Sequence, residues 1–417
     1  MSIYFDNTET RLPNEREADL FEKLPARLSA TIKNSTGWAT FLNGLDPDLV
    51  TDRAALADLP VLRKSDLKQM QADNPPLAGF GVGSNETFGR VFMSPGPIFE
   101  PQGPDADPWR GSRALYAAGF RKGDLLHNTF SYHLTPGGFI LDYGARAMGC
   151  SVIPAGTGNT ELQLDAIEQL KPTGYTGTPD FLKILLDKAQ DLGRDASSIT
   201  KALVSGGALF PSMRQEYAER GVQVMQCYAT ADVGVIAYES QTEGGEITQG
   251  MVVNEDIIVE IVKPGTGEPV AIGEVGELVV TAFSAGYPMI RLATGDLSAL
   301  MEGQSPCGRT NQRLKGWMGR ADQTAKVKGM FIHPSQINNI AKQHSQLGRI
   351  RLVVERDGSK DKMTLKVECE SQSNDLQKAI AQTLQTQCKV RGDVEFCAPN
   401  SLPNDGVIIS DERDYEA

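Results

Sequence analysis

Two segments of the chain combine small residues with polar groups directly after an apolar run. Val204 is followed by Ser205, Gly206 and Gly207, and Gln226 opens the run Cys-Tyr-Ala-Thr-Ala-Asp. Small residues at the carboxyl end of a strand let a planar ring approach the backbone, so both segments are candidates for binding one. An ordinary strand-to-helix turn explains each segment equally well. Other motifs must therefore show whether the two segments bind a ligand.

A denser series of motifs lies within residues 286–336. It contains, in order, Tyr-Pro-Met-Ile-Arg from Tyr287, Thr-Gly-Asp-Leu from Thr294, Gly-Arg-Ala-Asp-Gln from Gly319 and Lys-Gly-Met from Lys328. A lone carboxylate or a lone Gly-Arg pair means little. The order of the series therefore carries more information than any one of its members.

The surrounding pattern predicts an α/β fold. The first quarter reads as mainly helical, with a helix over 13–35 and another that Ser65 would cap. From about residue 110, short apolar runs alternate with helical segments, which is typical of parallel strands joined by crossover helices. Ligand sites in such sheets lie beyond the carboxyl ends of the strands. Residues 250–300 instead look all-β, which predicts a second sheet.

The length and the pattern together predict two domains. A chain of 417 residues is larger than a single core usually grows. After Asp322 the pattern restarts as an α+β unit near the common domain size. We expect a large multi-sheet α/β N-terminal domain over 1–318 and a small mobile α+β C-terminal domain over 319–417.

The composition argues against several classes of partner. With 41 basic and 53 acidic residues, the formal charge is 41 − 53 = −12. This charge opposes general binding to nucleic acid or to an anionic membrane, and no basic run offsets it. No signal peptide or transmembrane span is visible. The six scattered cysteines suggest neither a disulfide framework nor a metal knuckle, so a cytoplasmic location fits best.

The ordered motifs resemble the phenylacetate-CoA ligase family of adenylate-forming enzymes, from about Leu59 to Asp411. Further matching pieces are Leu-Pro-Val-Leu-Arg-Lys-Ser-Asp-Leu from Leu59, Gly-Phe-Arg-Lys-Gly-Asp from Gly119, Gly-Cys-Ser-Val-Ile-Pro from Gly149 and Phe-Ile-His-Pro from Phe331. The resemblance implies that a carboxylate attacks the α-phosphate of ATP to give an acyl-adenylate, and that the CoA thiol then displaces AMP. It also implies a small domain that swings about a hinge at Asp322 between the two steps, and relatives are often homodimers.

The resemblance further implies which residues bind the nucleotide. Tyr228 would stack on adenine, and Asp296 would bind the ribose hydroxyls, since a carboxylate accepts two hydrogen bonds. Asp232 stands where the family usually has a glutamate that binds Mg²⁺, a role that an oxygen ligand can fill. The full implied nucleotide site is Ser94, Gly96, Ser205, Gly206, Gly207, Tyr228, Ala229, Thr230, Asp296 and Arg320.

A segment from His127 to Gly138 matches the part of the family that lines the acyl pocket. Its mixture of aromatic and small residues suits a flat aromatic acid. The alternative is a strand followed by a Pro-Gly turn, in which His133 is a core histidine. The implied acyl contacts are Ser131, Tyr132, His133, Pro136 and Gly137.

The resemblance also implies that Lys328 and Gly329 line the CoA channel.

Two positions depart from the family pattern. In the phosphate-binding loop, Ser94 and Gly96 remain, but a proline and an isoleucine replace threonines and Glu100 stands where a cation is usual. Prolines lack amide donors and a carboxylate repels triphosphate, so we expect loose ATP binding. Val407 aligns with the lysine that bridges carboxylate and phosphate in the first step. Losing one such charge typically costs on the order of 10²- to 10³-fold in rate.

Two hypotheses follow for the function. The first is an AMP-forming CoA ligase for an aryl or arylacetic acid, with an impaired first step. The second is a catalytically degenerate homologue that binds AMP or an acyl ligand as a sensor or partner protein. The expected ligands are ATP or AMP, Mg²⁺, CoA and a small carboxylic acid. We expect no zinc, because only Cys307 matches the residues that hold zinc in some relatives.

Overall fold

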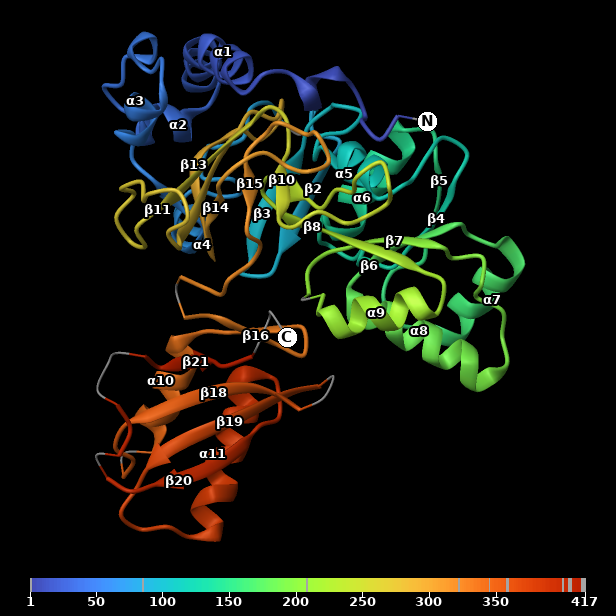
Figure 1. Ribbon diagram of the computed structural model, residues 1–417. Coiled ribbons are helices and arrows are strands. Elements are labelled where there is room, and N and C mark those ends of the chain that lie inside the picture. The colour runs from blue at the N-terminus through green and yellow to red at the C-terminus, as the bar shows by residue number, and fades with distance from the viewer. Residues whose placement is uncertain are drawn as a thin grey trace. The chain divides into compact units, whose positions relative to one another are not determined.

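The chain divides into two compact units, Met1–Trp317 and Met318–Ala417 (Figure 1). The computed structural model describes residues 2–84, 86–207, 209–321, 323–344, 346–357, 360–399, 401–403 and 407–413. Each unit contains its own clusters of buried apolar side chains, so each can be described by itself. Asp322 lies outside the described residues, and its role as a hinge stays a prediction.

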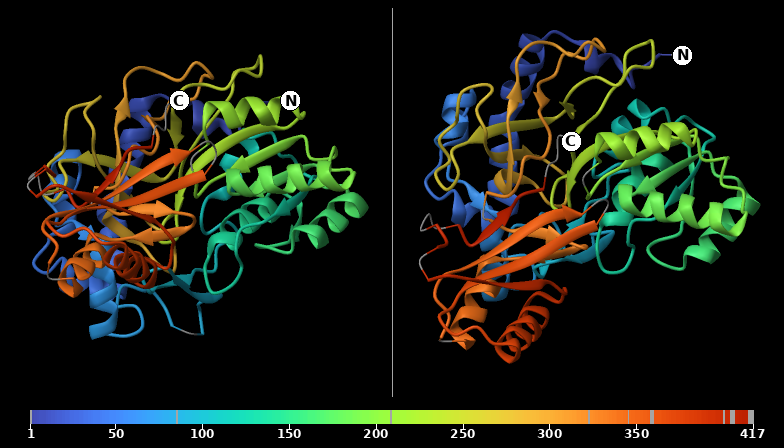
Figure 2. Two further views of the ribbon diagram at one scale, coloured as in Figure 1. Left: turned by 90° about the horizontal axis from the view of Figure 1, so that it is seen from below. Right: turned by 60° about the horizontal axis from the view of Figure 1, so that its bottom comes forward.

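Unit 1 begins with helices that cover one end of it. In the views of Figure 2, α1–α3 and α7–α9 lie on different sides of the unit. Leu20, Leu24 and Leu28 recur every fourth residue along α1 and are buried, which is why this segment folds as an amphipathic helix. The elements are η1 (Asn7–Thr10), α1 (Pro13–Asn34), α2 (Thr36–Phe41), η2 (Pro47–Leu49), α3 (Arg53–Ala57) and α4 (Lys64–Asp73).

The start of α4 differs from the expected one. Arg63 occupies the N-cap position and makes no side-chain cap, while Lys64 is already helical. Ser65 therefore lies inside the first turn, where its hydroxyl donates to Asp66 Oδ1 at 3.2 Å. The prediction of a Ser65 cap is wrong by two residues, because the helix already begins at Lys64.

A nine-stranded sheet forms the centre of unit 1, in the order β14-β15-β10-β9-β8-β7-β6-β4-β5. Its strands are β4 (Leu125–Asn128), β5 (Ser151–Pro154), β6 (Gly174–Gly177), β7 (Lys201–Val204), β8 (Gln223–Thr230), β9 (Gly234–Tyr238), β10 (Met251–Val253), β14 (Leu300–Met301) and β15 (Arg313–Leu314). The parallel part runs from β5 to β8, as the alternation of apolar runs and helices predicts.

Helices cover both faces of this sheet, with α8 and α9 on one face and α5 and α6 on the other (Figure 1). They are α5 (Gly111–Ala117), α6 (Gly137–Ala147), α7 (Thr160–Leu170), α8 (Pro179–Leu192) and α9 (Pro211–Glu219). The inner strands β4, β6 and β7 are buried almost throughout, whereas the edge strand β5 is partly exposed.

Two smaller sheets complete unit 1. The four-stranded sheet has the order β1-β13-β12-β11, and a separate hairpin pairs β2 with β3. Residues 250–300 contribute most of the four-stranded sheet, so the prediction of a second sheet there is confirmed. The strands are β1 (Leu62–Arg63), β2 (Arg90–Ser94), β3 (Ile98–Gln102), β11 (Ile257–Val262), β12 (Gly276–Ala282) and β13 (Met289–Ser298).

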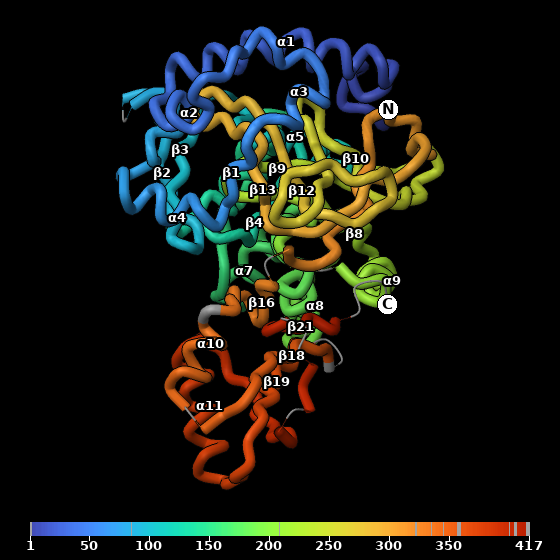
Figure 3. Tube along the Cα trace, turned by 90° about the vertical axis from the view of Figure 1, so that its left-hand side faces the viewer, coloured from blue at the N-terminus to red at the C-terminus, as the bar shows by residue number. Residues whose placement is uncertain are grey.

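Unit 2 is a small α+β structure. Its four-stranded sheet has the order β20-β19-β18-β21, and α10 and α11 pack against each other and against this sheet (Figure 3). A short hairpin, β16–β17, precedes them. The elements are β16 (Ala325–Val327), β17 (Met330–Ile332), α10 (Pro334–Gln343), β18 (Ile350–Asp357), β19 (Lys360–Glu368), α11 (Asn374–Cys388), β20 (Asp393–Cys397) and β21 (Ile409–Asp411).

A buried ion pair joins residues near the two ends of the unit 1 sequence. Arg309 Nε donates to Glu9 Oε1 at 3.2 Å, and both side chains are 1% exposed. Tyr238 Oη donates to the same oxygen at 2.6 Å. Burial and the nearby carboxylate raise the pKa of Tyr238, so its proton stays in this contact. The cluster joins η1 to β9 of the nine-stranded sheet.

We expect Arg309→Leu to lower the free energy of unfolding of unit 1 by about 3–5 kcal/mol, because it leaves the Glu9 carboxylate buried without its cation. Urea titration followed by tryptophan fluorescence measures the loss. Arg194→Leu is the control, since Arg194 pairs with Asp165 at the surface, and it should hardly shift the midpoint. Equal midpoints for the two variants would contradict a stabilising role for the buried pair.

Candidate functional site

The first candidate segment lies at the end of β7, where the sequence places it. Ser205 follows the last residue of the strand, and its hydroxyl donates to the Cys227 carbonyl on β8 at 2.8 Å. Gly206 has a φ of 71°, a conformation that glycine adopts without strain. The Ser205–Gly207 turn is thereby fixed beside β8, at the carboxyl end of the parallel strands.

The second candidate segment lies within a strand instead of beyond one. β8 runs parallel to β7 as far as Gln226 and then pairs antiparallel with β9, from Cys227 to Thr230. The pairing shifts register between Tyr228 and Ala229, as a β-bulge does. The strand is longer than expected because β9 offers a new partner where β7 ends. Tyr228, Ala229 and Thr230 remain partly exposed.

The structure brings Tyr228 and Asp296 together. Tyr228 Oη donates to Asp296 Oδ2 at 2.5 Å, which joins β8 to β13 of the other sheet. Trp317 Nε1 donates to Asp296 Oδ1 at 3.0 Å. Asp296 is only partly buried, so its oxygens stay within reach of a ligand. Trp317 is not among the residues predicted for the site, although its place two residues before Gly319 in the motif series could have indicated it.

A charged cluster lies at the turn after β8. Asp232 is buried, and its Oδ2 forms an ion pair with Lys64 Nζ. Burial disfavours the charge of Lys64, but Asp232 and Glu100 outweigh this and raise its pKa. The resemblance included Lys64 in a matching piece without giving it a role. The structure thus adds Lys64, a cationic residue, to those predicted for the nucleotide and metal site.

The hairpin β2–β3 takes the place that the resemblance gives to a phosphate-binding loop. Ser94 is buried and its hydroxyl donates to Glu100 Oε1 at 2.5 Å. Burial, and then the negative charge of Asp232, raise the pKa of Glu100 to about 8. Gly96 lies in the tight turn between the strands. Ser94 is thus committed to an internal contact, and Glu100 holds a proton at neutral pH in the ligand-free chain.

The predicted acyl segment forms the turn before α6. Tyr132 Oη donates to Asp142 Oδ2 at 2.9 Å and accepts from Asn128 Nδ2 at 2.7 Å. Its ring packs edge-on against Phe139. His133 is exposed, so the alternative that it is a core histidine is wrong. Ser131 and Gly137 are partly exposed and Pro136 is buried.

The remaining predicted residues belong to unit 2. Lys328 and Gly329 form the exposed turn between β16 and β17, and Lys328 N donates to Asp361 Oδ2 at 3.0 Å. Arg320 is partly buried at the start of the unit. Val407 is also partly buried, and its carbonyl accepts from Arg351 Nε at 3.1 Å. Their roles toward the nucleotide, CoA and the first step stay predictions.

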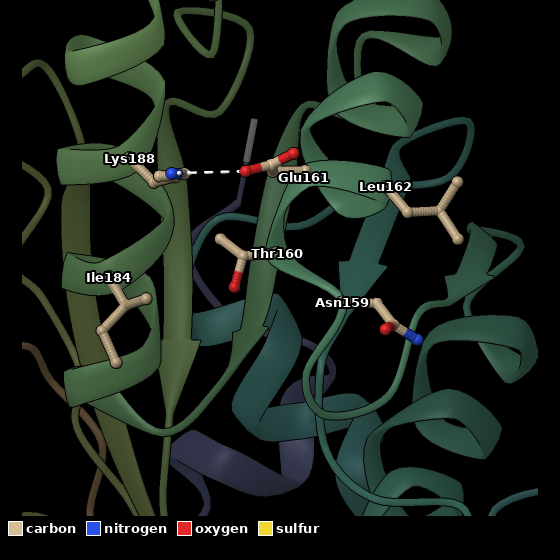
Figure 4. Close-up of a pocket in the computed structure, with 6 residues that line it drawn as sticks. All are labelled: Asn159, Thr160, Glu161, Leu162, Ile184 and Lys188. Carbon is tan, nitrogen blue, oxygen red and sulfur yellow. Dashed lines mark ion pairs between the residues drawn. The ribbon is translucent and has the colours of Figure 1, made fainter.

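A pocket outside the predicted site lies between α7 and α8 (Figure 4). Lys188 and Glu161 form an ion pair across it at 3.3 Å, and Leu162 and Ile184 are exposed at its rim. None of the predicted site residues lines this cavity, so we assign it no part in nucleotide binding.

The described ranges contain neither a preformed metal cluster nor a membrane-spanning helix. No group of three or more histidine, cysteine, aspartate or glutamate side chains in these ranges could hold a metal ion by itself. A cation at Asp232 would therefore need ligands from water or phosphate in addition. The helices of the same ranges include none that is long and apolar enough to cross a bilayer.

Comparisons with known proteins agree on one family. The model of the AMP-binding enzyme family matches residues 132–284, and that of the AMP-binding enzyme C-terminal domain matches residues 329–408. The chain is 31% identical over 381 residues to a phenylacetate-coenzyme A ligase from Aromatoleum evansii, covering 86% of this chain and 84% of the relative. It is 32% identical over 344 residues to one from Escherichia coli K12, covering 79% and 76%.

A comparison with solved structures supports the same family. A crystal structure of 2-hydroxyisobutyryl-CoA ligase with 2-HIB-AMP and CoA matches with a TM-score of 0.82 and 25% identity, over 99% of this chain and 93% of that one. This confirms the predicted α/β fold class. The chain belongs to the phenylacetate-CoA ligase family of adenylate-forming AMP-binding enzymes.

Proposed function

We propose that the chain is an AMP-forming CoA ligase that activates an aryl or arylacetic acid through an acyl-adenylate. The observation that carries the proposal is the contact of Tyr228 with Asp296 beside the Ser205–Gly207 turn. An aromatic face, a partly exposed carboxylate and a small-residue wall are the groups that a nucleoside needs. Curated relatives that are phenylacetate-CoA ligases support the reaction class and the aryl acid.

In the proposed reaction, the carboxylate oxygen of the acid bonds to the α-phosphorus of ATP as pyrophosphate leaves. The CoA sulfur then bonds to the acyl carbon, its proton passes to solvent, and AMP leaves. Tyr228 and Asp296 would hold the adenosine throughout, while Lys64 supplies positive charge near the phosphates. A divalent cation bound at Asp232 would neutralise phosphate charge. Lys328 and Gly329 would line the CoA path, and Arg320 would contact ribose or phosphate.

We also propose that the first step is slow in this chain. Val407 offers no charge at the position where the family resemblance implies a lysine, and the Ser94 hydroxyl is committed to Glu100. Two of the groups expected to act on triphosphate are therefore altered. The similarity to curated ligases does not favour the alternative of a purely non-catalytic sensor.

We expect Tyr228→Ala to weaken AMP binding about tenfold or more, because stacking one base on an aromatic ring is worth about 1–3 kcal/mol. Tyr228→Phe is the matched control, since it keeps the ring and removes only the hydroxyl that binds Asp296. Isothermal titration calorimetry with AMP measures both affinities. Equal losses in the two variants would contradict stacking on this ring.

We expect Val407→Lys to raise pyrophosphate exchange with phenylacetate or benzoate on the order of 10²- to 10³-fold, because it restores a positive charge for the first step. Val407→Met, a long neutral side chain, controls for size and should give no gain. Exchange of labelled pyrophosphate into ATP is the readout. Fast exchange by the natural chain, or no gain from the lysine, would contradict an impaired first step.

A further inference from the structure

The buried histidine of the predicted acyl segment is His127, near the end of β4. Its side chain is fully buried, and its Nε2 lies 2.8 Å from Oε1 of Gln163 on α7. Successive side chains of a strand point to opposite faces of the sheet, so the next residue, Asn128, faces the other way. His127 therefore acts on the α7 side of β4, whereas Asn128 contacts Tyr132.

The hydrogen bonds of Gln163 decide which nitrogen of His127 carries the proton. Gln163 Nε2 donates to the Gly158 carbonyl at 2.7 Å and to the Gly156 carbonyl at 3.0 Å. Carbonyl oxygens only accept, so the amide nitrogen faces them and the amide oxygen Oε1 faces His127. Oε1 also only accepts, so His127 Nε2 is the donor. In the neutral imidazole, Nδ1 is then a bare acceptor.

His127 is held in this neutral form. Within the described part of the chain, its Nδ1 is buried and has no hydrogen-bond partner, so a second proton would gain no acceptor. Burial lowers the pKa of His127, because a charged ring is poorly solvated there. The His127–Gln163 contact is therefore a clamp with one orientation of the amide, and it holds the carbonyls of Gly156 and Gly158.

The clamped loop and the acyl segment meet at the end of β4. Gly156 N donates to the Asn128 carbonyl at 3.0 Å, which ties the loop after β5 to β4. Asn128 Nδ2 donates to Tyr132 Oη at 2.7 Å and to the Gly138 carbonyl at 2.8 Å, which ties the acyl segment to the same residue. The backbone of Asn128 thus supports one segment, and its side chain supports the other.

We propose that His127 is a positioning residue for binding of the acid: through Gln163 it fixes the loop at 156–158, and the loop fixes Asn128 and the acyl segment that Asn128 holds. His127 itself does not touch the acid. Its effect is confined to the acyl part of the site, because Tyr228 belongs to another strand, β8. The role in acid binding rests on the proposed function, whereas the clamp itself does not.

Nitrogen-15 labelling of the four histidines tests the clamp in the full chain without a ligand. Long-range proton–nitrogen correlation spectra distinguish the two neutral tautomers, and the signals absent from His127→Gln are those of His127. We expect a protonated Nε2 and a bare Nδ1 at neutral pH. A proton on Nδ1, alone or in a charged ring, would overturn the clamp.

Calorimetric titration with phenylacetate and with benzoate, each in the presence of AMP, tests the role in acid binding. We expect His127→Leu to weaken binding of the acid about tenfold or more, because Gln163 Oε1 is left buried without a donor. His127→Gln is the conservative control, since its amide can still donate, and it should restore most of the affinity. Gln163→Glu keeps an acceptor for His127 but cannot donate to the two glycine carbonyls, so it should weaken acid binding as His127→Leu does.

AMP affinity shows whether the effect is confined to the acyl segment. It should be unchanged in His127→Leu, and an equal loss of AMP and acid affinity would overturn the proposed role. Unchanged acid affinity in both His127→Leu and Gln163→Glu would overturn it as well. If the natural chain binds neither acid, the proposed aryl-acid function fails and the role in acid binding fails with it, whereas the nitrogen-15 spectra still support or overturn the clamp.

Discussion

The change of partner along β8 is the constraint on which the candidate site depends. The strand is parallel to β7 up to Gln226, and from Cys227 onward it is antiparallel to β9. This change brings Tyr228 to β13, where Asp296 accepts a hydrogen bond from its hydroxyl. It also places Asp232 in the tight turn between β8 and β9, facing Lys64. One strand thus positions the Tyr228 ring and the Asp232 carboxylate, the groups that we propose for the two ends of a nucleotide.

The two ends of this site differ in character. At the proposed adenosine end, Asp296 accepts from Tyr228 and Trp317 and remains partly exposed, so a ribose could compete for its oxygens. At the proposed phosphate end, the Ser94 hydroxyl donates to Glu100 within the β2–β3 hairpin. We infer a chain built to hold AMP more firmly than triphosphate. Positive charge from Lys64 and from a bound cation would then have to attract the triphosphate, because the Ser94 hydroxyl is bound to Glu100.

Much of the fold could be predicted from the sequence, because local patterns decide it. Apolar runs separated by helices predict the parallel strands β4 to β8, and Ser205 lies at the end of β7 as expected. Contacts between distant residues could not be predicted from a single sequence. Lys64 and Asp232 are separated by 168 positions, and no spacing rule connects them. The continuation of β8 from Cys227 to Thr230 has the same cause, because it depends on pairing with β9.

The proposed function requires that this chain makes a thioester from an adenylate more readily than it makes the adenylate. The direct measurement is the rate of phenylacetyl-CoA formation from preformed phenylacetyl-adenylate and CoA, compared with the rate from ATP, phenylacetate and CoA, each corrected with heat-denatured protein. We expect thioester from both mixtures, with the preformed adenylate much the faster. Equal rates would contradict an impaired first step, and no thioester from either mixture would contradict the assignment as a CoA ligase.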